Sequence, residues 1–178
     1  GNSRIVCGAL IVTNGGVLQV WSGPTNAANP NYGALVSAAQ NLGVGANSWI
    51  YCRSDGDNGG SPLFRAATMD VATGGGIDAD IWGFALMKGP GRGTTMYGGA
   101  GHAGPGTGAG AGVAYGSATA PVTPGSGGGG TESSEGGGAI RVEVTRTLTL
   151  DGTLRANSWN APGVHHAGGS GGAIYLRC

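Results

Sequence analysis

Apolar and polar residues alternate in several short runs along this chain. The clearest run extends from Ile140 through Leu150 and ends at the turn-forming pair Asp151-Gly152. Near the start, the stretch ALIVTNGGVLQVW divides into two short apolar runs at Asn14-Gly15-Gly16. Period-two alternation bounded by glycine and Asn or Asp is typical of β-strands joined by tight turns. The pattern therefore predicts many short strands separated by glycine turns.

Helical spacing is nearly absent. Only the stretch YGALVSAAQNLG, residues 32–43, has apolar residues spaced near the helical period, and its glycines and its neighbours NPN and GVGAN argue against a helix. We expect almost no helix. A chain of many short strands with glycine turns is typical of a sandwich, a barrel or a solenoid.

An internal repeat favours the solenoid. Residues 61–82, SPLFRAATMDVATGGGIDADIW, match residues 138–159, GAIRVEVTRTLTLDGTLRANSW, at a shift of 77 positions. Repeated strand-turn-strand units that cannot close their own cores indicate a stacked architecture. We predict an all-β fold, a right-handed parallel β-helix with long glycine-rich loops. Its interior column would include Leu148, Leu150, Leu154 and Ala156.

Composition limits the choice of partners. The 178 residues include 41 glycines, only 10% are charged, and the formal net charge is zero. Nothing in this balance attracts nucleic acid or an anionic membrane surface, and no apolar run reaches the length of about 18 residues that a membrane span needs. We expect one domain, 1–178, with N-terminal rungs in 1–87, a glycine-rich loop insertion in 88–138 and C-terminal rungs in 139–178.

One glycine-rich stretch, GPGTGAGAG at Gly104–Gly112, has glycine at every second position. On an extended chain one face of this stretch would carry no side chains. We expect it to lie flat against the solenoid with that face on another backbone. The alternative is a flexible linker.

Seven short motifs occur in order between Gly74 and Leu176: GGGIDADIWGF, GPGRG, GAGHAG, AYGS, PGSGGGG, GGGAIRVEVTRTLTLDGTLRAN and GGSGGAIYL. In this respect the chain resembles the glycine-rich β-helix module of large secreted and cell-surface proteins. The resemblance implies an extracellular location and a passenger, stalk or surface role. It implies no reaction and no cofactor.

Candidate chemistry is sparse. A glycosidase needs two carboxyl groups facing each other across a cleft, and only Asp78 and Asp80 form a same-face pair on an expected strand. A solvated strand edge is the favoured interpretation of this pair, so we predict no catalytic residue and no enzyme, with a polysaccharide lyase or hydrolase as the alternative. His102 and the pair His165-His166 are residue types that bind transition metals, but exposed loop positions are the favoured interpretation. We therefore predict no metal site.

The tryptophans suggest a binding surface. The motif NSW occurs twice, at Trp49 and Trp159, which predicts equivalent corners of two rungs. Exposed aromatic rings at such corners would form a carbohydrate-binding face together with Asp78 and Asp80. Buried packing at the corners is the favoured interpretation, and the carbohydrate-binding face is the alternative.

The strand-like ends and the cysteines suggest assembly. The apolar runs at Arg4–Leu10 and Ala173–Cys178 would leave unpaired backbone at both ends of a solenoid, and such edges recruit further strands. The three cysteines, Cys7, Cys52 and Cys178, are an odd number, so at least one is free or paired outside the chain. We expect an extracellular structural module that assembles head to tail into a filament or adjoins further rungs of a larger surface stalk. The alternative is a carbohydrate-binding or polysaccharide-cleaving β-helix.

Overall fold

The fold consists of short strands and long glycine-rich segments. A computed structural model describes residues 3–130, 134–159 and 167–178. These residues form no helix, so none that could cross a membrane is found among them. The strands of this part of the chain are β1 (Arg4–Cys7), β2 (Leu10–Val12), β3 (Val17–Trp21), β4 (Ala34–Val44), β5 (Trp49–Arg53), β6 (Pro62–Val71), β7 (Gly76–Asp78), β8 (Ala139–Leu150), β9 (Thr153–Arg155) and β10 (Ala173–Arg177). The ambiguous stretch at residues 32–43 lies mainly in β4, so the expectation that it is not a helix is confirmed.

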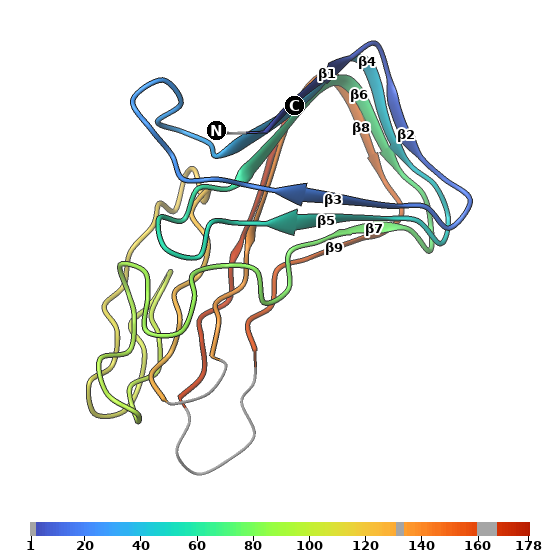
Figure 1. Ribbon diagram of the computed structural model, residues 1–178. Coiled ribbons are helices and arrows are strands. Elements are labelled where there is room, and N and C mark those ends of the chain that lie inside the picture. Colours follow the sequence, from blue (N-terminus) through green and yellow to red (C-terminus); the bar gives the residue numbers. More distant parts are fainter. Residues whose placement is uncertain (1–2, 131–133, 160–166) are drawn as a thin grey trace.

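The strands form two parallel sheets. Sheet A has the order β1-β4-β6-β8-β10, and β2 also pairs with β4. Sheet B has the order β3-β5-β7-β9. Figure 1 shows the two sheets meeting at an angle along the turns that lead from β4 to β5 and from β8 to β9, with the glycine-rich segments gathered away from that corner.

The predicted right-handed β-helix is wrong, because the strands close no solenoid. Only two sides of the structure are sheets. Between β7 and β8 the described residues contain no strand at all, and glycine-rich chain stands where further strands would be needed. Glycine brings no side chain to pack against a pleated sheet, and this explains why strands are not extended there.

The 77-residue repeat is reproduced in one sheet and shifted in the other. Ile77 of β7 lies opposite Leu154 of β9, as the repeat predicts. Between β6 and β8 the register differs, and Val71 lies opposite Leu150 rather than Leu148. One residue of this difference is already present where Leu63 lies opposite Arg141, and the second arises at an irregularity in the ladder between Ala66 and Thr68.

The core lies between the two sheets. Buried residues on neighbouring strands lie opposite one another, such as Val36, Phe64 and Val142 in sheet A and Ile50 and Ile77 in sheet B. Of the predicted column, the side chains of Leu148, Leu154 and Ala156 are partly buried against this core.

The inward position predicted for Leu150 needs correction. Leu150 lies opposite the buried Val71, but its side chain remains 40% exposed. Strand β10 pairs with β8 only from Ala139 to Glu143. The end of β8 is therefore an uncovered sheet edge, and burial of Leu150 is incomplete.

The glycine-rich segments are ordered by backbone hydrogen bonds. The amide of Gly136 donates to the carbonyl of Phe84 at 3.0 Å, the amide of Gly137 donates to Ser170 at 3.0 Å, and the carbonyl of Gly137 accepts from Gly125 at 2.8 Å. One segment thus bonds to three neighbours, whereas a strand within a sheet has two. Bonds in three directions are expected for extended chains with about three residues per turn.

Part of the stretch Gly104–Gly112 packs against backbone, as predicted, but this backbone belongs to other glycine-rich segments and not to a solenoid surface. A methyl group at Gly106 would overlap the carbonyl of Gly99, and one at Gly112 would overlap the carbonyl of Gly91. The stretch does not stay extended, however: the amide of Gly106 donates to the carbonyl of Gly112 at 2.9 Å, which folds the segment back on itself. It is a packed turn, and the flexible-linker alternative is wrong.

Candidate functional site

Three large side chains meet at the carboxyl ends of the strands of sheet B. Trp21 ends β3 and lies opposite Arg53, which ends β5. In this ladder the amide of Ser22, the residue after Trp21, donates to the carbonyl of Arg53 at 2.8 Å. In the same way, the amide of Ser54, the residue after Arg53, donates to the carbonyl of Trp82 at 3.0 Å. Trp82 therefore lies opposite Arg53, and the row reads Trp21, Arg53, Trp82.

A two-residue insertion brings Trp82 into this row. Tyr51 lies opposite Asp78, and Arg53 lies opposite Trp82. On β5 one residue, Cys52, separates Tyr51 from Arg53. On the neighbouring segment three residues separate Asp78 from Trp82, namely Ala79, Asp80 and Ile81. The amide of Trp82 closes the insertion into a turn by donating to the carbonyl of Ala79 at 3.3 Å.

The row forms a compact cation–aromatic cluster. The guanidinium carbon of Arg53 lies 4.4 Å from the ring centre of Trp21 and 3.4 Å from that of Trp82. The two indole rings are 5.6 Å apart at an angle of 71°. Desolvation lowers the pKa of Arg53, opposed by the nearby charge of Asp78. The Nε atom of Arg53 is buried and has no hydrogen-bond partner within the described part of the chain.

Asp78 and Asp80 hold the inserted turn in place. The Asp78 carboxylate accepts from the amide of Asp80 at 2.7 Å and from the Arg155 guanidinium at 2.6 Å. The Asp80 carboxylate lies 3.2 Å from Nε of Arg155 and accepts from the amide of Asn157 at 2.6 Å. Both carboxylates are thus neutralised by one arginine and do not face each other across a cleft. This is the arrangement of a structural pair, not of a glycosidase acid and base.

Ile81 lies in the inserted turn with a backbone φ of 58°. A β-branched residue at positive φ is a conformational outlier and is disfavoured by about 1–3 kcal/mol. The hydrogen bonds around Asp78 and Asp80 hold the turn in this conformation. The strain lies directly beside Trp82.

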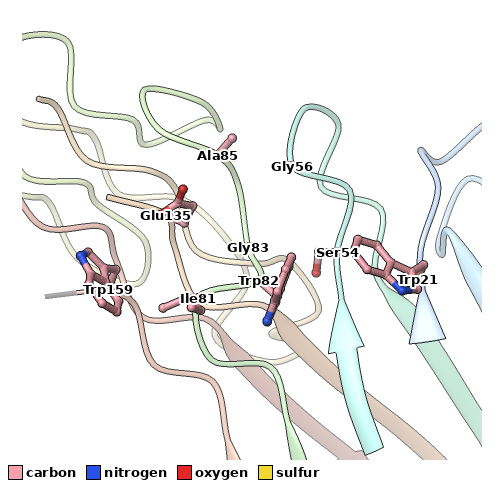
Figure 2. Close-up of a pocket in the computed structure, with 9 residues that line it drawn as sticks. All are labelled: Trp21, Ser54, Gly56, Ile81, Trp82, Gly83, Ala85, Glu135 and Trp159. Carbon is pink, nitrogen blue, oxygen red and sulfur yellow. The ribbon is translucent and has the colours of Figure 1, made fainter. Parts of the chain in front are cut away.

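A pocket of about 510 Å³ opens beside the cluster. We call it the Trp pocket, and its lining residues are Trp21, Ser54, Gly56, Ile81, Trp82, Gly83, Ala85, Glu135 and Trp159. Figure 2 shows its three indoles spread from Trp159 across Trp82 to Trp21, with Glu135 above Ile81. Trp21 and Trp159 are exposed to solvent. The pocket has the size and the largely apolar lining of a small-molecule site.

The structure separates the predicted carbohydrate-face residues. Trp159 lines the Trp pocket, but Trp49 stacks on Tyr51 with ring centres 6.5 Å apart and is covered by Arg155. The sequence patterns do not identify Trp21 and Trp82 as site residues, although each is the last residue of a strand-like run, VLQVW and IDADIW respectively. That common position at a strand end was the available signal.

The three cysteines are free and widely separated. Cys7 lies on β1 and is half-buried, Cys52 is buried in β5, and Cys178 is exposed after β10. Burial and the nearby charge of Asp78 raise the pKa of Cys52, which makes its thiol unreactive. Since β1 and β10 are the opposite edges of sheet A, Cys7 and Cys178 cannot bond within one chain.

His102 is engaged by the protein. Its Nδ1 lies 2.9 Å from the carbonyl oxygen of Gly171, so Nδ1 donates, and Nε2 lies 3.2 Å from the hydroxyl of Thr123. Burial lowers its pKa, which favours the neutral ring. The described residues contain no group of three metal-binding side chains, and His165 and His166 lie outside them.

The Trp pocket and the strand edges at the two ends of the sheets can contact other molecules. No family model, no curated protein and no solved structure matches this chain.

Proposed function

We propose that this protein binds carbohydrate chains in the Trp pocket. The observation that carries the proposal is that three indoles, those of Trp21, Trp82 and Trp159, line one open pocket, and that Trp21 and Trp159 are exposed. An indole offers a wide apolar face and a polar N–H, which suits sugar rings that have apolar faces and hydroxyl edges.

The spread of the rings favours an extended ligand. A single small ligand is best held by rings that converge on one point. Trp21 and Trp82 form a pair, whereas Figure 2 shows Trp159 set apart from this pair, with Ile81 between Trp82 and Trp159. Ser54 and Glu135 add polar groups beside the rings. Such an arrangement supports contact with successive sugar units of one chain.

The site is also preorganised. Trp21 and Trp82 are fixed by their places in the ladder and by Arg53 between them, and the turn before Trp82 is held by Asp78 and Asp80. Rings that are already ordered lose little conformational entropy on binding.

The test uses the two NSW motifs as a matched pair. We expect Trp159→Ala to weaken binding of a responsive oligosaccharide at least about tenfold, or about 1.4 kcal/mol, because it removes one wall of the pocket. Trp49→Ala should leave binding unchanged, because Trp49 lies outside the pocket lining. Titration calorimetry with glucose, glucosamine and N-acetylglucosamine hexasaccharides measures both. Absence of binding to all three, or equal loss in both variants, would contradict the proposal.

We propose self-assembly as a second function, in an extracellular filament or stalk. It is supported by the strand edges: β1, β2 and β3 lie at one end of the two sheets and β9 and β10 at the other, so pairing of one copy on the next would continue both parallel ladders. Apolar side chains are exposed at both ends, among them Val6, Ile11, Val17, Leu150 and Ile174. Cys7 of one copy would then approach Cys178 of the next.

This assembly predicts that the molecular mass in solution rises with protein concentration, and that the rise depends on the edge strand β1. Sedimentation velocity should show growing oligomers as the protein is concentrated, and Val6→Lys should prevent them, because a charge on an edge strand opposes strand addition. Ala27→Lys, in the exposed loop after β3, adds the same charge away from the edges and should have no effect. A monomer at all concentrations would rule the assembly out.

A further inference from the structure

Within the part of the chain that the structure describes, the Glu135 carboxylate has no protein partner. Its side chain lines the pocket, while its backbone carbonyl accepts from the amide of Trp159 at 3.2 Å. Within the described residues no ion pair or side-chain hydrogen bond involves this carboxylate. The described carboxylates of Asp55, Asp78 and Asp80, by contrast, all accept hydrogen bonds.

The remaining charges near the pocket balance one another. Arg155 contacts both Asp78 and Asp80, and Arg53 adds a second positive charge that interacts with Asp78. Two cations thus stand beside two anions. Asp55, in the adjoining loop, accepts from the amides of Asp57 and Asn58 at 3.2 and 2.7 Å. The charge that Glu135 presents to the pocket is therefore not cancelled.

We propose that the Trp pocket selects glycans that carry a protonated amino group, namely oligosaccharides of amino sugars that are not N-acetylated. This inference rests on the proposed carbohydrate binding and names the ligand class. The ammonium group would donate to the Glu135 carboxylate in a charge-assisted hydrogen bond. The indole of Trp159, which unlike Trp21 and Trp82 does not lie against Arg53, would attract the same cation.

The same geometry disfavours neutral sugars. A neutral oligosaccharide in the pocket would remove water from Glu135 without supplying an opposite charge, and burial of an unpaired charge is unfavourable. An anionic sugar would add repulsion. Selectivity therefore comes from Glu135, and the stacking itself comes from the tryptophans.

The experiment compares three hexasaccharides of glucosamine, N-acetylglucosamine and glucose, in a mildly acidic buffer that protonates the sugar amines. For the wild-type protein we expect the glucosamine chain to bind at least about tenfold more tightly than the other two, with a preference that weakens as salt is added. Glu135→Gln should abolish the preference, because it removes the charge that pairs with the ammonium group and also the charge whose desolvation disfavours the neutral chains. Asp151→Asn removes the same charge at the exposed β8–β9 turn and should preserve the preference.

The outcomes separate the two proposals. If all three chains bind equally and Glu135→Gln changes nothing, the amino-sugar inference fails while carbohydrate binding stands. If none binds, both fail. If tetramethylammonium chloride displaces the glucosamine chain at comparable concentration, the pocket recognises a simple cation, and the inference of an amino sugar is overturned.

Discussion

Replacing Gly112 with alanine is expected to lower the free energy of unfolding by about 1–3 kcal/mol or more. The new methyl group would overlap the carbonyl oxygen of Gly91 and come within 2.8 Å of the amide of Gly101. Neither backbone can move away freely, because the amide of Gly101 donates to that same carbonyl of Gly91 at 2.8 Å, and the amide of Gly112 donates to Gly99 at 2.9 Å. Urea denaturation followed by tryptophan fluorescence would measure the change.

Gly104→Ala is the matched control for this prediction. It lies in the same alternating stretch, but a methyl group there would meet nothing within 4 Å. Since alanine also restricts the unfolded chain, the variant should be unchanged or more stable by about 0.4–1 kcal/mol. Equal behaviour of the two variants would mean that the glycine segments do not pack backbone on backbone.

Replacing Ile140 with alanine is expected to destabilise the protein by about 2–5 kcal/mol. The Ile140 side chain is 0% exposed and belongs to the core cluster between the two sheets. Truncation would leave a cavity that the paired strands on either side of β8 cannot close by collapsing. The same urea denaturation measures the effect.

Ile174→Ala provides the comparison, because Ile174 lies directly opposite Ile140 on β10. Its side chain is 39% exposed, so the same truncation removes less buried surface and should have a clearly smaller effect. A larger loss at Ile174 than at Ile140 would contradict the core described above.

The sequence by itself determined the local structure. Alternation from Ile140 to Leu150 and the glycine turns are consequences of residue type and period, and the strands form where the pattern places them. The packing of Gly104–Gly112 on backbone was also predictable, since a run of glycines has a physical advantage only where other atoms approach closely. The repeat correctly aligned Ile77 with Leu154, because no irregularity interrupts β7 and β9.

Only the tertiary structure decided how these elements meet. No local pattern distinguishes Trp49 from Trp159, since both follow Asn-Ser, yet one packs on Tyr51 and the other lines the Trp pocket. The row of Trp21, Arg53 and Trp82 depends on two inserted residues, which shift the ladder register, and register is set by pairing between distant strands. The open arrangement of the two sheets is likewise set by pairing between distant strands. Glycine segments supply hydrogen bonds without side chains, so where they lie is decided by the neighbouring backbones and not by their own sequence.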